Sequence, residues 1–518
     1  MHLELPDAVT IPRNAYQGKN IRSVHMPNVT TIQEEAFAGC PLVSVHMPKV
    51  TTIHAYAFAE TQLNAIHMPN ATHVDMYAFY KTPLRSVRAD KLKHLGTNAF
   101  LGCHALEQVH MPQLIDVGGN AFLRCTALKQ VHMPELRNVG NYAFKGCTNI
   151  HTVRTPNVTH VHQEAFRGCT ALLDVHMPNV EHLGNLAFAQ CTQLRSISMP
   201  KLKFLREKTC HSCTQLENVH LEHVQAVGKR AFEHCTALAH VHMPNAEKIC
   251  TDTFHKCTSL ATLRLPNVKH FGKDVDIFTK GICGKCTALH TVDLPRVTVV
   301  YPHSFNMCIR LHDVYLPRVR WIKEAAFFGC WSLNTLQLPV DAIKRNAFGN
   351  CTHLQDVRLP AVTTVGKYAF RGCNALRNLH MPQVRILEDN VFQGCPLDKM
   401  VLPALQRVEN NTFQHNTCPL FAPNTLHVAY TPKYDITPQQ YRAYRELVEW
   451  EPHFRARIFA KRLSTRVPAP ADKAMHVVYK HGVADYATLR QLVHTLGQLA
   501  PMLLQPPYLH FLTRELRL

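Results

Sequence analysis

Residues 23–40 read SVHMPNVTTIQEEAFAGC, and residues 44–60 repeat the pattern as SVHMPKVTTIHAYAFAE. The proline of this pattern sets the register of the chain, because its position recurs in steps of 21 or 22 residues with one step of 29. The nineteen positions are 6, 27, 48, 69, 90, 112, 134, 156, 178, 200, 222, 244, 266, 295, 317, 339, 360, 382 and 403; Asp90 and Glu222 stand there in place of proline. A fixed period in the twenties is typical of a stacked solenoid.

Each unit carries its apolar residues at fixed distances from this position, which we call the repeat proline. The residues three and one before it are apolar, as in Val24 and Met26, and their neighbours are mostly polar. This alternation predicts a short strand with one buried face, and proline ends the strand because it lacks an N–H donor. Further apolar residues follow at Ile32 and Phe37, and we interpret the Ala-Phe-x-x-Cys segment as one short helical turn. Since one unit cannot bury its own apolar face, we expect about 19 coils to stack over residues 1–423 as an α/β repeat solenoid.

Fifteen of the 19 cysteines fall at one repeat position, as Cys40 does. A column of one small residue type predicts buried, reduced thiols in successive coils. Two CxxC strings, at residues 210–213 and 283–286, together have the cysteine pattern of a four-cysteine zinc site. Their columns lie three coils apart, however, and four thiolates around zinc must each lie about 2.3 Å from one ion. The second string lies in the one seven-residue insertion, where a separate redox or metal role stays open.

The residue two before the repeat proline points outward from the predicted strand and changes from coil to coil. Histidine is the commonest residue there, and the alternatives for it are a solvated strand residue, which we favour, a surface that becomes charged below about pH 6.5, and a metal chelate. Repeat proteins usually meet partners on such a face. The predicted partner-binding residues are His25, His46, His67, Arg88, His110, His132, Arg154, His176, His220, His242, Arg264, Asp293, Tyr315, Gln337, Arg358 and His380.

The pattern LxxVxMPxVTxIxxxAFxGCxxL, present as LLDVHMPNVEHLGNLAFAQCTQL at residues 172–194, resembles the BspA-like, or Treponema pallidum-type, leucine-rich repeats. The resemblance covers about residues 1–423. It implies a curved, right-handed leucine-rich-repeat array with its parallel sheet on the concave face, used for adhesion or other protein binding. It implies no catalytic residues, and because many relatives are surface proteins it also allows a cell-surface location.

Composition limits the other functional classes. The formal net charge of +19 favours polyanions such as RNA, DNA or an anionic surface as an alternative partner, although the basic residues are scattered rather than gathered in a block. The sequence contains no run of 18 apolar residues, so we expect no transmembrane helix. The first residues lack the pattern of a signal peptide. We therefore expect a cytoplasmic, monomeric, non-enzymatic protein that requires no cofactor and no metal.

Residues 424–518 depart from the repeat. Thr437 and Pro438 have the character of a helix start, and the apolar spacing of DYATLRQLVHTLGQLA predicts another helix. We expect a small α-helical module here. Two roles stay open for it, a cap over the last coil, which repeat arrays require, and an adaptor that docks a second protein.

Overall fold

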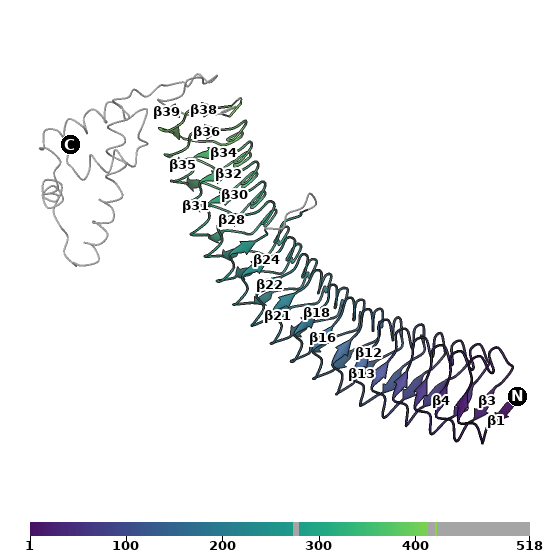
Figure 1. Ribbon diagram of the computed structural model, residues 1–518. Helices are drawn as coiled ribbons and strands as arrows, with labels where there is room; N and C mark the ends of the chain where they lie inside the picture. Colours follow the sequence, from purple (N-terminus) through teal and green to yellow (C-terminus); the bar gives the residue numbers. More distant parts are fainter. Residues whose placement is uncertain (273–278, 399, 410, 413–419, 422–518) are drawn as a thin grey trace, which may run out of the picture. The chain divides into compact units, whose positions relative to one another are not determined.

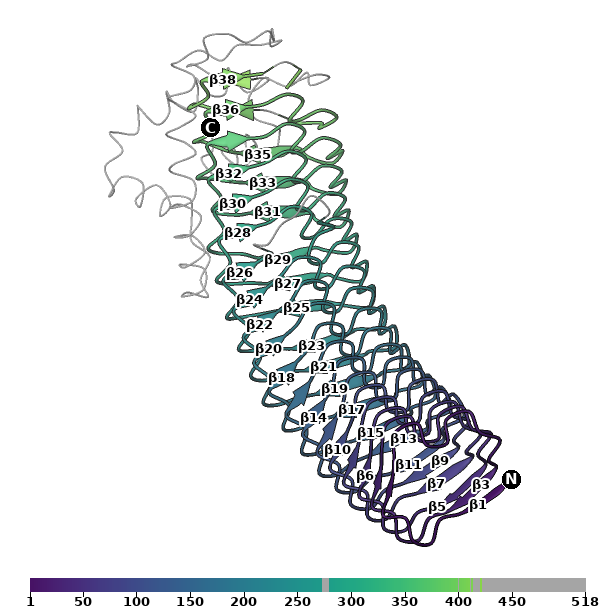
Figure 2. The ribbon, with the colours of Figure 1, turned by 45° about the vertical axis from the view of Figure 1, so that its right-hand side comes forward.

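The computed structural model describes residues 1–272, 279–398, 400–409, 411–412 and 420–421. Within these residues the chain forms only strands and turns. Each coil contributes a longer strand before its repeat proline, three residues long in every coil but the last, and a two-residue strand after it. Figures 1 and 2 show the coils side by side in the order of the sequence. The predicted parallel-sheet solenoid is confirmed, whereas the helical module predicted at residues 424–518 lies outside the described residues.

The longer strands end two residues before each repeat proline. They are β1 (His2–Glu4), β3 (Ser23–His25), β5 (Ser44–His46), β7 (Ala65–His67), β9 (Ser86–Arg88), β11 (Gln108–His110), β13 (Gln130–His132), β15 (Thr152–Arg154), β17 (Asp174–His176), β19 (Ser196–Ser198), β21 (Asn218–His220), β23 (His240–His242), β25 (Thr262–Arg264), β27 (Thr291–Asp293), β29 (Asp313–Tyr315), β31 (Thr335–Gln337), β33 (Asp356–Arg358), β35 (Asn378–His380) and β37 (Met400–Val401).

The two-residue strands follow each repeat proline. They are β2 (Thr10–Ile11), β4 (Thr31–Ile32), β6 (Thr52–Ile53), β8 (His73–Val74), β10 (His94–Leu95), β12 (Asp116–Val117), β14 (Asn138–Val139), β16 (His160–Val161), β18 (His182–Leu183), β20 (Phe204–Leu205), β22 (Ala226–Val227), β24 (Lys248–Ile249), β26 (His270–Phe271), β28 (Val299–Val300), β30 (Trp321–Ile322), β32 (Ala342–Ile343), β34 (Thr364–Val365), β36 (Ile386–Leu387) and β38 (Arg407–Val408); β39 (Leu420–Phe421) follows them.

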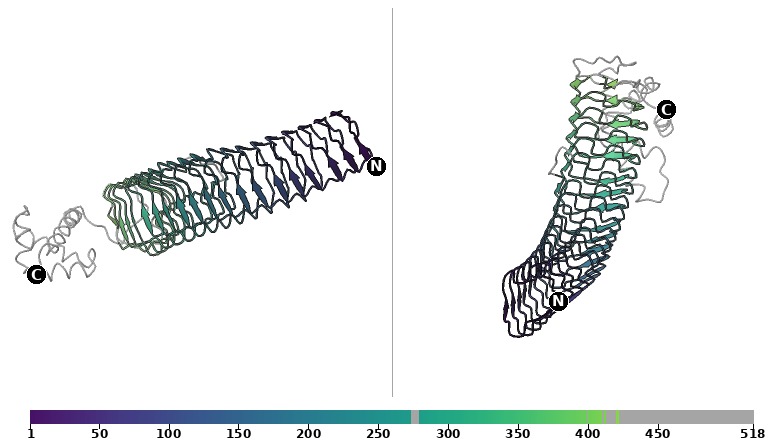
Figure 3. Two further views of the ribbon diagram at one scale, coloured as in Figure 1. Left: turned by 90° about the horizontal axis from the view of Figure 1, so that it is seen from below. Right: turned by 90° about the vertical axis from the view of Figure 1, so that its right-hand side faces the viewer.

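Strands of the same kind pair in parallel between successive coils, so every coil has two sheet-forming sides (Figure 3). The pairing keeps the repeat in register, with Val24 opposite Val45 and Ile32 opposite Ile53. The longer strands β1 to β35 form sheets of three or six members, β37 forms a two-stranded sheet with β39, and the two-residue strands β2 to β18 form one sheet of nine. The second sheet was not predicted, because two residues are too few to show an alternation.

The core is a set of ladders in which one residue type stacks on its copy in the next coil. The rings of Phe122, Phe144 and Phe166 are fully buried and lie parallel, with centroids 5.1 and 5.2 Å apart. The ladder changes at the insertion, where Cys283 occupies the phenylalanine position and Phe271 stacks on Phe305 at 5.6 Å. Each coil therefore depends on its neighbours to bury its apolar side.

The prediction of a helical turn in the Ala-Phe-x-x-Cys segment is wrong. In the second coil Glu35, just before the segment, and Gly39, within it, have φ of 54° and 67°, and such left-handed residues interrupt a right-handed helix. The segment is instead a series of turns, in which Cys40 N–H donates to Phe37 O at 3.2 Å. Phe37 N–H donates to Ala57 O of the next coil at 2.9 Å, so the backbone is paired both within and between coils.

All the cysteines that the structure describes are buried, and none of them forms a disulfide. The repeat cysteines share one contact, in which the thiol donates to the carbonyl at the phenylalanine position of the preceding coil. Cys147 Sγ lies 3.0 Å from Phe122 O, and Cys213 Sγ lies 3.1 Å from Phe188 O. Thr61 occupies the cysteine position in its coil and donates to Phe58 O at 3.0 Å. The position thus favours a small residue that is also a hydrogen-bond donor.

Candidate functional site

The outward residues of the longer strands form the surface that we call the strand face. It consists of the sixteen residues predicted to bind a partner, and fourteen of these are exposed; His25 and Asp293 are half-buried. Their neighbours along the same strands point into the core, since Val87 and Val131 are 2% and 1% exposed. The alternation along each strand therefore separates a constant interior from a variable surface.

Histidines of neighbouring coils stack on this face because parallel pairing holds them in register. The rings of His25 and His46 lie 4.7 Å apart and nearly parallel, at 5°. His220 and His242 repeat this arrangement at 4.7 Å and 13°. Stacked imidazoles present their ring nitrogens side by side, so one carboxylate that faces these nitrogens can reach both rings.

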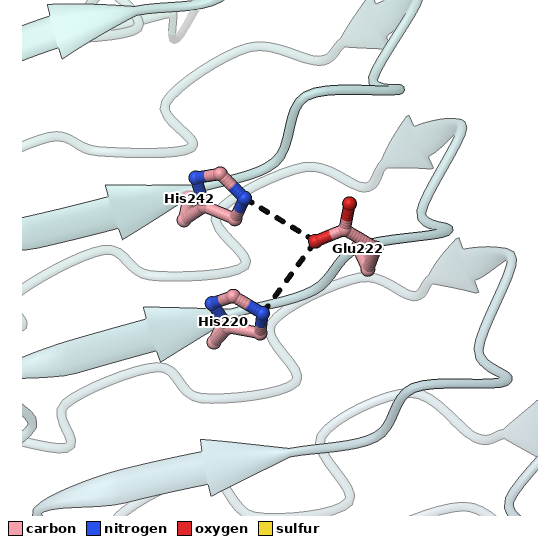
Figure 4. A group of neighbouring side chains, drawn as sticks. All are labelled: His220, Glu222 and His242. Atoms are coloured by element: carbon pink, nitrogen blue, oxygen red, sulfur yellow. Dashed lines mark hydrogen bonds and ion pairs between the residues drawn. The ribbon is translucent and has the colours of Figure 1, made fainter.

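Asp90 and Glu222, the two residues that replace a repeat proline, both lie against the strand-face histidines. Asp90 contacts Arg88 Nε at 3.1 Å and also lies 3.6 Å from His67 Nε2 and 3.4 Å from His110 Nε2. Burial alone would raise the pKa of Asp90, but hydrogen bonds and the charge of Arg88 lower it overall. Glu222 lies between His220 and His242, as Figure 4 shows. Among the described residues, no arginine forms an ion pair with it.

The strand face changes character in its last third, around Asp293. A shallow groove of about 410 Å³ is lined there by Arg264, Asp293, Tyr315 and Gln337, four of the predicted residues, together with their strand neighbours. Tyr315 is 58% exposed, and the Oδ1 atom of Asp293 is buried without a hydrogen-bond partner. The structure thus brings these four together beside the sheet break between β29 and β31.

A second outward column, four residues after most repeat prolines, was missed by the sequence reasoning. His160 and His182 stack there at 4.4 Å and, with Phe204, line a hollow of about 350 Å³. Burial and the neighbouring His182 lower the pKa of His160. Phe204 is 48% exposed, as large apolar side chains at contact surfaces often are. The frequent histidine at this position was the available signal.

A buried charged cluster on the turn side of the coils was also missed. Glu233 is 3% exposed and lies 3.5 Å from His211 Nε2, 3.4 Å from His255 Nδ1 and 3.2 Å from Lys280 Nζ. Burial alone would raise the pKa of Glu233, but these partners hold it far below its usual range. Asp252 accepts a hydrogen bond from Lys280 N–H at 2.8 Å, so the cluster fixes the chain where it returns from the insertion.

The CxxC strings do not come together. Cys210 and Cys283 occupy the phenylalanine position of their coils, and all four cysteines of the two strings are fully buried. Among the described residues, the groups of three or more potential metal ligands are His220, Glu222 and His242, and Glu233, His234 and His255. Neither group contains a cysteine.

The stacked coils, their inward aliphatic and phenylalanine ladders and the variable strand face define a leucine-rich-repeat solenoid. The model of the BspA type leucine rich repeat region matches residues 9–129, 93–217, 159–280, 203–319 and 298–419. These overlapping matches span most of the chain, which therefore belongs to the BspA-type leucine-rich repeat family. None of the curated proteins matches the chain.

Three solved structures illustrate the likeness. A leucine-rich repeat protein from Bacteroides ovatus is 19% identical, over 82% of this chain and 92% of that protein, with a TM-score of 0.37. A leucine rich cell surface protein from Faecalibacterium prausnitzii is 21% identical, over 73% and 87%, with a TM-score of 0.28. The T. pallidum leucine rich repeat protein is 24% identical, over 34% and 78%, with a TM-score of 0.27.

The described part of the chain holds no helix with the length and apolar character needed to cross a bilayer.

Proposed function

We propose that this chain is a monomeric, non-enzymatic scaffold that binds a partner protein through the strand face. The observation that carries the proposal is the separation of constant and variable residues on one strand. The inward residues Val87 and Val131 repeat from coil to coil and are buried, whereas the outward Arg88 and His132 differ and are exposed. A surface of this kind can change its specificity without changing the fold.

The two ends of the strand face suit different chemistry. Histidine and arginine dominate it as far as Arg264, which suits an acidic stretch of the partner. The groove at Asp293, Tyr315 and Gln337 offers an acid, an exposed aromatic ring and an amide. Aromatic residues are enriched at the centre of protein interfaces, so this groove is the proposed anchor point.

The test compares two triple charge reversals in the full-length chain. Arg88→Glu, Arg154→Glu and Arg264→Glu alter the strand face, whereas Arg124→Glu, Lys285→Glu and Arg371→Glu make the same change of charge at exposed residues of the turns. Affinity purification with quantitative mass spectrometry should show loss of the partner with the first variant only. Partners unchanged by the first variant would contradict the proposal.

A polyanion binder is the second candidate, favoured by the net charge of +19. It predicts that both triple variants lose affinity equally and that binding to RNA or DNA falls steeply as salt rises. That outcome would replace the proposed protein partner with a polyanion.

We further propose that the protein works in a reducing compartment such as the cytoplasm. The support is chemical, because none of the described cysteines forms a disulfide and the repeat cysteines donate to backbone carbonyl oxygens, as Cys147 does. Free thiols in such number are typical of a compartment where thiols are kept reduced.

A further inference from the structure

His220, Glu222 and His242 converge on one point of the strand face, as Figure 4 shows. Glu222 Oε2 lies 3.5 Å from His220 Nε2 and 3.2 Å from His242 Nε2, and the three ligand atoms all lie within 4.8 Å of one another. We propose that these three residues form a binding site for one divalent transition-metal ion of the Zn²⁺ class. The proposal is independent of the protein-binding function.

The separations suit ligands that share one ion. Zinc lies about 2.0–2.1 Å from a histidine nitrogen and about 2.0–2.2 Å from a carboxylate oxygen. Two ligands of a tetrahedral ion are then roughly 3.3–3.5 Å apart. The 3.5 and 3.2 Å separations between Glu222 and the two rings agree with this. The two histidine nitrogens lie within 4.8 Å of each other, so the exposed rings must tilt toward each other to share the ion.

The backbone already holds the three ligands in place. His220 and His242 are direct partners in the pairing of β21 with β23, and Leu221 N–H donates to His242 O at 3.0 Å. Asn245 Nδ2 donates to Glu222 O at 2.9 Å, as Asn267 Nδ2 does to Pro244 O in the next coil. A site on paired strands loses little conformational entropy when it binds an ion.

Glu222 is what distinguishes this site from the other stacked histidines. Where proline stands in its place, as at residue 27, the histidine pair has no carboxylate at this position. Asp90 also supplies a carboxylate, but Arg88 lies against it at 3.1 Å and brings a positive charge to the position where the ion would bind. The residues around Asp90 therefore form a natural control with a carboxylate but no metal-binding geometry.

The donor set selects the class of ion. Neutral imidazole suits zinc, copper and nickel, whereas calcium and magnesium prefer oxygen ligands alone. The three side chains are 64%, 44% and 56% exposed, so the remaining coordination positions are open to water. One carboxylate offsets half the charge of a divalent ion, as in other sites built from two histidines and a glutamate.

The experiment is a calorimetric titration of Zn²⁺ into untagged, metal-free, full-length protein with a phosphine reductant. Glu222→Pro places at this position the proline that most coils carry there, and it removes the carboxylate. The substitution is compatible with the fold, because the other coils form no hydrogen bond from a proline N–H at this position. We expect one saturable site in the wild type and at least a roughly tenfold loss of affinity in Glu222→Pro. Asp90→Pro is the matched control and should keep the wild-type affinity, and Mg²⁺ should give no saturable heat.

Visible absorption of bound Co²⁺ gives a second readout, with Glu222→Gln as a variant of nearly unchanged shape. The tetrahedral Co²⁺ bands of the wild type should be lost in Glu222→Gln and kept in Asp90→Pro. The proposal is overturned if the wild type shows no saturable site, if the glutamate variants bind as tightly as the wild type, or if Asp90→Pro loses binding to the same extent.

Discussion

The repeat cysteines show how a single residue can satisfy two demands. The position is fully buried, and Cys147 donates a second hydrogen bond to Phe122 O of the preceding coil, which already accepts from Cys125 N–H. The column could be predicted as buried because nearly every coil carries a small residue at this position, as at Thr61. The hydrogen-bond partner could not be predicted, because it belongs to a different coil.

The thiols should be almost unreactive in the folded protein. Burial raises the pKa of Cys103 to about 11 and that of Cys351 to about 12, so the reactive thiolate is scarce at pH 8 and becomes commoner only as the pH approaches these values. Protein that has been reduced and freed of reductant should show few labelled cysteines when titrated with a disulfide reagent at pH 8 in the native state, and all 19 after denaturation. Rapid labelling of the native column would contradict this assignment.

A gain of metal binding should follow from Pro27→Glu. His25 and His46 stack at the same 4.7 Å as His220 and His242, and Met26 N–H donates to His46 O at 2.8 Å, as Leu221 does to His242. The new carboxylate should therefore complete a second site. Calorimetry should show about one additional Zn²⁺ per chain, and an unchanged stoichiometry would show that the stacked pair and a carboxylate are not sufficient.

At the scale of the elements, the strands were predictable and the turns were not. Val24 and Met26 alternate with polar residues, which indicated a strand, whereas the Ala-Phe-x-x-Cys segment has a spacing that a helical turn also satisfies. The deciding feature is the left-handed backbone at Glu35 and Gly39. A glutamate gives no clear sign of that conformation, and glycine alone is consistent with a helix end as well.

The Glu233 cluster could not be predicted either, because its members come from three coils and from the end of the insertion. His211, Glu233 and His255 each follow the phenylalanine position of their coil, where other coils carry unrelated residues such as Ala38 and Leu101. Aligning these coils shows that the three residues share one repeat position, but it does not show that Lys280 lies beside Glu233. Arg230, three residues earlier, also lies 3.7 Å from the carboxylate, but the contact with Lys280 joins residues 47 positions apart and shows only in the structure.

Glu233→Gln should destabilise the array by about 1.5–3 kcal/mol at pH 7, because the buried carboxylate that accepts a hydrogen bond from the Lys280 ammonium is lost. The folded-state pKa of Glu233 is lowered, so its contribution is fully present above the usual carboxylate range and is lost as the pH falls below about 4.5. Urea unfolding at pH 7 and pH 3 should therefore show a smaller difference between variant and wild type at pH 3.

Glu207→Gln is the control for this experiment, because the Glu207 side chain is 43% exposed and pairs only with Lys208 among the described contacts. Its effect should stay below about 1 kcal/mol, as expected of a surface ion pair. Equal effects of the two substitutions, or a Glu233 effect that does not depend on pH, would contradict the role given to the cluster.

At the scale of the molecule, the account depends on the stacked array presenting a continuous strand face while its core stays constant. The most direct test is site-specific photo-crosslinking in cells, with a photoreactive residue at His132 on the strand face or at Arg124 on the turns. Both positions are exposed, so the photoreactive residue should not disturb the fold of either variant. The account predicts that one partner protein crosslinks efficiently from position 132 and not from position 124. Crosslinking of the same partner from position 124 alone would show that the strand face is not the binding surface.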